Sequence, residues 1–448
     1  LQRLFISYRA RDRQTGRRLF PIQRAASIMH PPTVSNGRSA SKLLPNHSKT
    51  PARDEFGVLT FGETSQSSVN GNDRSIVGLV TLAHAMVHTF ELSIPILMIE
   101  WLDAFPVTKA TLGIIVGAGY ALFGIGALPG GILADAVGSR RLIAFSLGGM
   151  AAAFLLVSVA PSVTVLAIAL MLWGIAGSVY HPSGLTLISK GVTERGEGLA
   201  YHGIAGNLGT ALGPLVTILL LLVFDWGTTA ALLVVPALVG AAVALRIDVD
   251  ETAAVEVTDG GTPQATAVTS LSDFLADTRA LFVGGFVLVF GVVMMSGLYY
   301  RGVLTFLPDV IAGFDAMSAT SVAGVTMEPS RYVYVGLLMV GTAGQYVGGT
   351  LSDRVRPGRG ILGAYGILAL LAIVFVPIAN VGLVPLLALA ALLGFFLFMV
   401  QPIYQAAVAE LTPAGTRGLS YGFVYFGTFG IGAGGGAIAG VLLTYANE

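Results

Sequence analysis

Apolar stretches of about 20–28 residues recur along the chain, each long enough for a helix to cross a hydrocarbon core of roughly 30 Å. Only 11% of the residues are charged and 54% are hydrophobic, whereas a soluble globular chain has about 25% charged residues. Membrane β-barrel strands alternate apolar and polar residues, and these stretches do not. The sequence therefore predicts an all-α, multi-pass membrane protein. We place its eleven spans at residues 76–101, 110–134, 141–160, 162–189, 197–223, 227–246, 280–307, 331–352, 360–379, 381–410 and 417–445.

A polar linker divides these spans into a group of six and a group of five. We predict a basic N-terminal region over 1–75, a first helix bundle over 76–246, a cytoplasmic linker over 247–279 and a second bundle over 280–448. The N-terminal region is expected to be either a disordered tail or a non-native extension of the reading frame.

Loop charges predict the orientation. Basic residues such as Arg140, Lys190 and Arg354 fall on one side of the membrane if the spans alternate from an inside N-terminus, and few fall on the other side. Loops rich in Lys and Arg stay cytoplasmic. We therefore expect the N-terminus and the central linker to lie in the cytoplasm. We also expect the protein to be a monomer of the cell membrane.

The two halves of the chain repeat each other. The segment GGILAD at Gly130–Asp135 recurs as GGTLSD at Gly348–Asp353, and Arg195-Gly196 has a counterpart in Arg417-Gly418. The chain holds 58 glycines, and pairs such as Gly113-x-x-x-Gly117 are expected to let helices pack backbone to backbone. Matching signals at matching places are typical of the repeats of a transporter.

The stretch GGILADAVGSRR, from Gly130 to Arg141, resembles the loop motif of the major facilitator superfamily, G-x-x-x-D-x-x-G-R-[R/K]. This resemblance implies a fold of two six-helix bundles and a secondary transporter. Since members of the superfamily usually have twelve spans and eleven are visible here, we expect that a twelfth has been lost. We expect Gly131 to let two helix ends approach closely, and Asp135 to cap a helix or to pair with an arginine across the interface between the halves. The predicted conformational latch comprises Gly131, Asp135, Gly138, Arg140, Arg141, Asp353 and Arg354.

Within the superfamily, three stretches resemble the fosmidomycin-resistance type of efflux carriers: YHPSG at Tyr180–Gly184, the segment Arg195–Pro214, and Arg301 followed by TFLP at Thr305–Pro308. An antiporter motif is half present, because Gly209–Pro214 fits it and the glycine pair that should follow is missing. The resemblance implies proton-coupled efflux of a small organic solute. Proton-coupled uptake of an organic anion or another metabolite remains the alternative.

Ionisable side chains inside the spans mark the candidate site. His84, His88 and Glu91 are spaced i, i+4, i+7, so they share one face of a helix. A charge at the bilayer centre costs about 2.5–3.5 kcal/mol on insertion scales, and such residues usually mark a substrate or ion path. The family resemblance places spans 1, 4, 7 and 10 around a central cavity. The predicted substrate and proton path comprises His84, His88, Glu91, His181, His202, Arg301, Gln401 and Tyr404.

Each of these residues has a structural alternative. Glu91 is the candidate proton carrier, or else a paired carboxyl that ties helices together; His88 would relay the proton or contact the substrate. Arg301 suits an anionic substrate group or Glu91 itself. His84 is as well explained by packing or snorkelling. His181 precedes Pro182, and its ring could simply satisfy the carbonyls that the proline frees.

Gln401 and Tyr404 could contact the substrate or form interhelical hydrogen bonds. The sequence has no Walker motif, no sign of a bound cofactor and no metal-ligand cluster with a recognisable spacing along the chain. The expected partners are a small-molecule substrate, protons and the lipid bilayer, with no nucleic acid. A membrane-embedded enzyme acting on lipid-linked substrates is the rival class, and we expect no enzyme because the halves repeat and the loop acids are scattered.

Overall fold

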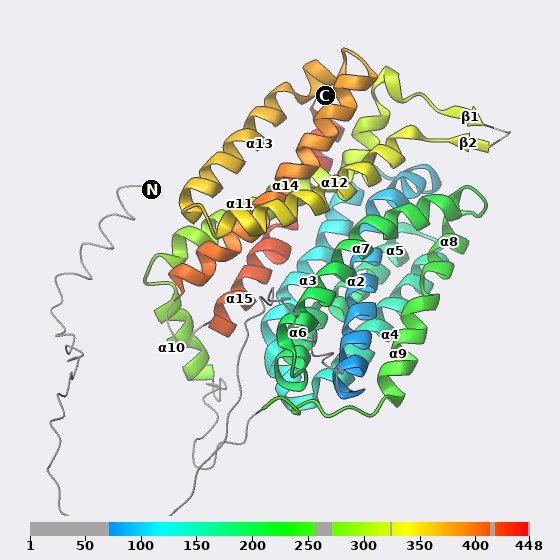
Figure 1. The fold of residues 1–448 in the computed structure, drawn as a ribbon. Helices are drawn as coiled ribbons and strands as arrows, with labels where there is room; N and C mark the ends of the chain where they lie inside the picture. The colour runs from blue at the N-terminus through cyan, green and yellow to red at the C-terminus, as the bar shows by residue number, and fades with distance from the viewer. Residues whose placement is uncertain (1–70, 256–270, 323–324, 413–416, 447–448) are drawn as a thin grey trace, which may run out of the picture. The chain divides into compact units, whose positions relative to one another are not determined.

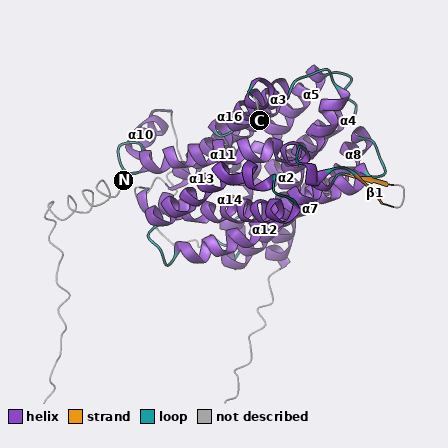
Figure 2. Ribbon diagram, turned by 90° about the horizontal axis from the view of Figure 1, so that it is seen from above, coloured by secondary structure: helices purple, strands orange, loops and turns teal. Residues whose placement is uncertain are grey.

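The computed structural model describes residues 71–255, 271–322, 325–412 and 417–446, and helices make up nearly all of this part of the chain (Figure 1). The first half contains α2 Gly71–Ala104, α3 Lys109–Val137, α4 Ser139–Ser158, α5 Val163–Ser178, α6 Tyr180–Gly191, α7 Arg195–Leu221, α8 Trp226–Leu233 and α9 Val235–Arg246. The second half contains α10 Leu271–Leu281, α11 Phe286–Ala312, η1 Asp315–Met317, β1 Thr320–Val322, β2 Val325–Met327, α12 Pro329–Ser352, α13 Pro357–Ala379, α14 Leu383–Leu411, α15 Arg417–Tyr425, η2 Phe426–Ile431 and α16 Gly434–Tyr445. Figure 2 shows that the only strands in the described part form a small hairpin at one edge.

The prediction of an all-α membrane fold is confirmed. In the described residues, ten helical segments are long and apolar enough to cross a membrane. The predicted span 331–352 corresponds to α12, a continuous helix of 24 residues that is not among the ten. Helices dominate because a bilayer core offers no water to the backbone, so each spanning segment must satisfy its own N–H and C=O groups.

One span boundary was wrong. The seventh span begins at Phe286 rather than at residue 280, and a separate helix, α10, crosses the predicted boundary between linker and second bundle. Gly284 and Gly285 lie between the two helices, where glycine favours a break because it loses the most freedom in a helix. Helix α2 begins within the predicted N-terminal region, and the predictions for residues 1–70 and 256–270 lie outside the described residues. The four domain boundaries remain predictions.

The fourth span is broken into α5 and α6 at Val179. Pro182 lacks an N–H and cannot continue the α5 hydrogen-bond ladder. The hydroxyl of Ser183 donates to the carbonyl oxygens of Val179 (2.6 Å) and Tyr180 (3.0 Å). Ser183 therefore stabilises the carbonyls of Val179 and Tyr180 at the break, whereas the N–H that Pro182 lacks would have bonded to the carbonyl of Ser178, four residues earlier.

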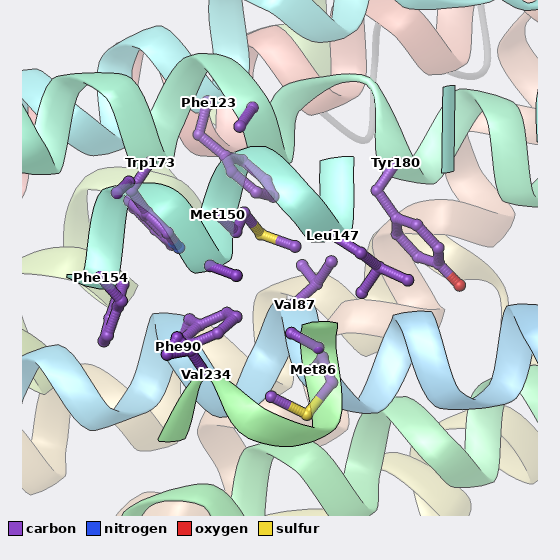
Figure 3. Packing of buried hydrophobic residues seen from close by; sticks show 14 of the residues in the cluster. Met86, Val87, Phe90, Phe123, Leu147, Met150, Phe154, Trp173, Tyr180 and Val234 are labelled. Atoms are coloured by element: carbon purple, nitrogen blue, oxygen red, sulfur yellow. The ribbon is translucent and has the colours of Figure 1, made fainter. Parts of the chain in front are cut away.

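The first half packs around a dense aromatic and aliphatic core between α2, α4 and α5 (Figure 3). The ring centroids of Phe90 and Phe154 lie 4.3 Å apart, and Trp173 stacks on Phe123 with a centroid distance of 5.7 Å. Lipid is as apolar as these side chains, so close packing rather than removal from water holds the helices together.

Helix α3 joins the two halves through glycines. A methyl group added to Gly124 would lie 2.0 Å from the backbone nitrogen of Gly430, and one added to Gly113 would lie 2.7 Å from the carbonyl oxygen of Gly436. Gly117 faces the carbonyl oxygen of Ala433 in the same way. The prediction that glycines pack helices backbone to backbone is confirmed here, and the contact is made with η2 and α16.

Candidate transport site

A cavity of about 1140 Å³ lies between the two halves. Helices α2, α3, α6 and α7 line it from the first half, and α11, α12, α14, α15 and η2 line it from the second. Seven residues of the predicted path lie on its wall: His84, His88, Glu91, His181, His202, Gln401 and Tyr404. The cavity reaches Asp135 and Lys190, whose side chains are 52% and 41% exposed, so its mouth lies at this end of the molecule. We name this the cavity end.

Glu91 and Arg301 form an ion pair at the inner end of the cavity, and the pair joins α2 of the first half to α11 of the second. Both side chains are almost fully buried. The guanidinium of Arg301 lies over the ring of Tyr120, 3.8 Å from its centroid, and the Tyr120 hydroxyl donates to the carbonyl oxygen of Glu91 at 2.8 Å. Of the two roles expected for Arg301, the structure shows the pairing with Glu91.

The spacing i, i+4, i+7 on α2 produces a continuous row of contacts. A carboxylate oxygen of Glu91 lies 2.6 Å from Nδ1 of His88, and Nε2 of His88 lies 3.1 Å from Nε2 of His84. Nδ1–H of His84 donates to the backbone carbonyl oxygen of His202 on α7 at 2.6 Å. The His84 ring is buried in the protein, so it does not snorkel to the surface.

His181 and His202 complete the group from two other helices. The His181 ring lies edge-on to His84 with a centroid distance of 5.2 Å, and the His202 ring stacks on His84 at 3.8 Å. The Ser183 hydroxyl donates to the carbonyls of Val179 and Tyr180 rather than to that of Ser178, so the role of His181 remains a prediction. The sequence pattern missed Tyr120, which holds Arg301, because span 2 was not expected at the cavity.

Gln401 and Tyr404 on α14 form part of the opposite wall of the cavity. Tyr404 is largely buried and Gln401 is half-buried. Their positions fit contact with a solute, and their role remains a prediction.

The predicted latch differs from the structure in two respects. Asp135 pairs at 2.6 Å with Lys190 of α6, within the first half, rather than with an arginine across the interface. The cavity lies between the halves at this end, with Asp135 on its wall. A methyl group added to Gly131 would meet no atom within 4 Å, and Gly131 lines the cavity. One added to Gly130 would lie 2.5 Å from the Pro182 ring, so Gly130 makes the close approach.

The remaining latch residues stabilise helix ends or face outward. Gly138, at φ +95°, makes the turn between α3 and α4, and Glu251 accepts from the backbone N–H of Ser139 at 2.7 Å. Arg140 donates to the carbonyl oxygens of Ala244 and Ile247, both at 3.0 Å, and so fixes the end of α9. Arg141, Asp353 and Arg354 are exposed, and none forms an ion pair within the described part of the chain.

At the other end of the molecule, two ion pairs join the halves. Nζ of Lys109 lies 2.6 Å from a carboxylate oxygen of Asp309, and a guanidinium nitrogen of Arg331 lies 2.7 Å from Glu100. Each pair takes one residue from each half. We name this the sealed end, because none of these four residues lines the cavity. Sequence analysis missed both pairs, although Lys109 and Arg331 are rare basic residues on that side.

Comparison with known families agrees with this architecture. The sequence profile of the Major Facilitator Superfamily matches residues 77–437. The chain belongs to this superfamily. It is accordingly a multi-pass membrane transporter and not an enzyme, a conclusion that comes from the family and the fold.

Two curated relatives match over short regions. The puromycin resistance protein pur8 of Streptomyces alboniger is 36% identical over 102 residues, and the multidrug efflux pump LfrA of Mycolicibacterium smegmatis is 37% identical over 100 residues. Each match covers 22% of this chain and 20% of the relative. The chain thus spans about a fifth of the length of these relatives, and the finer resemblance to fosmidomycin-resistance carriers remains a prediction.

Solved transporters share the fold. A bacterial homolog of the human lysosomal transporter Spinster, in an inward-facing and unoccupied conformation, aligns with a TM-score of 0.61 and 15% identity, covering 81% of both chains. A D-xylose–proton symporter aligns with a TM-score of 0.56 and 14% identity, covering 84% of this chain and 98% of its own. At such identities the likeness establishes the fold alone.

Proposed function

We propose that this transporter exports a small organic solute in exchange for protons, by alternating access. The observation that carries the proposal is the one-ended cavity with the Glu91–Arg301 pair at its inner end. In the superfamily fold, two bundles rock about a central site so that it faces each side of the membrane in turn. We further propose that the cavity end faces the cytoplasm and that the protein is a monomer of the cell membrane.

The Glu91–Arg301 pair offers a way to couple the proton to the rocking motion. It is a buried contact between the halves, and it joins α2 to α11 beside the cavity. A proton that binds to the carboxylate competes with Arg301 for it and weakens the link between the halves. His88, within 2.6 Å of Glu91 and on the cavity wall, provides the route by which that proton reaches the cavity.

The alternative is uptake of an organic anion or another metabolite together with protons. It is retained because the antiporter motif is incomplete: Gly209–Pro214 fits it, but the glycine pair that should follow is missing. The two functions predict opposite effects of the same pH gradient on solute movement. The direction of transport under an imposed gradient therefore separates them.

The test is flux of solute in proteoliposomes under an imposed pH gradient, with puromycin and a panel of organic anions as probes. Wild-type protein should accumulate solute uphill under the gradient. Glu91→Gln should lose uphill accumulation and keep gradient-independent exchange. Glu410→Gln makes the same chemical change at an exposed carboxylate of α14 and should behave as wild type. Uphill accumulation by Glu91→Gln would overturn the role of Glu91, and a wild type that responds to no gradient would overturn proton coupling.

A further inference from the structure

Four of the six histidines of the chain meet at the inner end of the cavity. His84 and His88 come from α2, His181 from α6 and His202 from α7. The proposed proton relay along α2 uses His88 alone. It therefore assigns no role to the other three imidazoles, those of His84, His181 and His202. Polar residues at this depth are costly and are usually functional.

The rings of His84 and His88 are held in the way that is typical of metal ligands. A histidine that binds a metal through one ring nitrogen nearly always has its other nitrogen fixed by a carbonyl or a carboxylate. Nδ1 of His84 is fixed by the carbonyl oxygen of His202, and Nδ1 of His88 by the carboxylate of Glu91, each at 2.6 Å. Both Nε2 atoms are thereby turned toward the same point.

The separation of these two atoms fits a shared ion. Nε2 of His84 and Nε2 of His88 lie 3.1 Å apart. Two nitrogens that bind one tetrahedral zinc ion at 2.0–2.1 Å lie roughly 3.3 Å apart. His181 supplies a third nitrogen, and the three ligand atoms all lie within 4.8 Å of one another. No hydrogen bond to the His181 ring is found in the described part of the chain, so its nitrogens are available to an ion.

His202 gives a second, independent observation. Its Nε2 is buried and has no hydrogen-bond partner among the described residues, although its side chain lies against His84. A buried polar atom without a partner costs about 1–3 kcal/mol. A hydrated ion beside His84 would provide the missing partner.

We propose that His84, His88 and His181 bind one divalent transition-metal ion of the zinc class. Imidazole ligands select such ions over magnesium and calcium, which prefer oxygen. Three protein ligands leave a fourth position for an exchangeable ligand, as in zinc sites that hold a substrate. That position faces the cavity, because all three histidines lie on its wall.

The size of the cavity indicates what fills the fourth position. At about 1140 Å³ it is far larger than an ion with a few waters, each of which takes about 30 Å³. The transported solute is accordingly an organic chelator that carries the metal ion with it. This statement about the cargo rests on the proposed transport function, whereas the ion site itself does not.

Binding of Co²⁺ to purified full-length protein tests the ion site. The protein should carry no polyhistidine tag, and His30 and His47, which lie outside the described residues, should be replaced by Asn in every sample. One Co²⁺ per chain should bind, with the visible absorption of a tetrahedral site, and Zn²⁺ should displace it. His181→Asn and His88→Asn should each weaken binding by at least the 10–100-fold that loss of an outer partner causes.

Gln405→Ala, at another position on the cavity wall, should bind Co²⁺ as the background protein does. Thermal unfolding with and without Co²⁺ checks that the histidine variants are folded: they should melt normally and show no shift with the ion. Failure of the background protein to bind Co²⁺, or full binding by a triple His84→Asn, His88→Asn, His181→Asn variant, would overturn the ion site.

Uptake of Zn²⁺–citrate and of citrate alone into proteoliposomes tests the cargo. Flux should depend on Zn²⁺ and should be lost in His181→Asn. If the protein binds Co²⁺ but moves metal-free citrate equally well, the cargo statement is wrong and the ion site stands. If neither probe moves while puromycin does, the cargo statement is again wrong and the proposed transport function stands.

Discussion

The two ends of the molecule use their charges differently. At the sealed end, Lys109–Asp309 and Arg331–Glu100 each tie the first half to the second. At the cavity end, Asp135 pairs with Lys190 inside the first half, and both side chains are about half exposed. Charges that cross the interface must separate when that end opens, whereas charges within one half can stay paired throughout. The sealed end is therefore where the conformation in the structure is stabilised.

Among the ion pairs that join the two halves in the described residues, Glu91–Arg301 is the most buried, and it lies between the two ends. Removing one partner of a buried ion pair leaves an uncompensated charge and costs about 3–5 kcal/mol. An exposed pair contributes only about 0–1 kcal/mol. Arg301→Met should thus lower the free energy of unfolding by about 3–5 kcal/mol, the largest effect expected.

Denaturant unfolding in detergent, followed by tryptophan fluorescence, measures this loss, because Trp101 and Trp173 are fully buried. Lys190→Met, the matched control at the cavity end, should change the midpoint little. Adding Glu91→Leu to Arg301→Met should recover much of the loss, since no charge is then left unpaired. Equal losses in the single and double variants would mean that the pair is not what stabilises this contact.

The glycines of α3 extend the same contrast. Gly113, near the sealed end, faces the carbonyl oxygen of Gly436 and the ring of Phe306, whereas Gly131, at the cavity end, has open space. Gly113→Ala should lower the free energy of unfolding by about 1–3 kcal/mol through overpacking. Gly131→Ala should leave it unchanged or raise it by about 0.5–1 kcal/mol, because alanine favours a helix.

The same unfolding assay compares these two variants. If Gly131→Ala destabilises the protein as much as Gly113→Ala, then α3 approaches another helix as closely at the cavity end as at the sealed end, and the contrast between the ends fails.

Sequence reasoning recovered the parts of this structure that depend on local pattern. The spans follow from hydropathy, and the row His84, His88, Glu91 follows from helical spacing alone. The pairing of Glu91 with Arg301 was one of two alternatives, because the sequence shows that both charges need partners without showing which conformation supplies them.

The parts that were missed depend on the relative position of helices far apart in the chain. The pairing of Asp135 with Lys190 was not predicted, and the pairing with an arginine across the interface in another conformation remains a prediction. The meeting of His84 and His88 with His181 could not be read from spacing, since His181 comes from α6 and the other two come from α2. The break at Val179 was expected near Pro182, but the role of Ser183 in serving its carbonyls was not.

The smallest expected effect concerns the sealed-end ion pairs, which are partly exposed. Each should contribute no more than about 1 kcal/mol, so Lys109→Met combined with Arg331→Met should alter overall stability little. It should nevertheless shift the balance between conformations, since 1.4 kcal/mol corresponds to roughly a tenfold change in a population ratio. The chain has no cysteine, so a single Ser330→Cys gives a clean reporter at a buried position beside Arg331.

Labelling of that cysteine by a membrane-impermeant maleimide should be slow in the otherwise wild-type chain and should rise by up to roughly tenfold when both sealed-end pairs are removed. Lys190→Met, which removes one lysine charge at the cavity end, should leave the rate unchanged, because its pair lies within one half. A comparable rise in Lys190→Met would show that charges within a half control opening as strongly as charges that cross the interface. The asymmetry between the two ends would then have to come from the glycine contacts of α3 rather than from ion pairs.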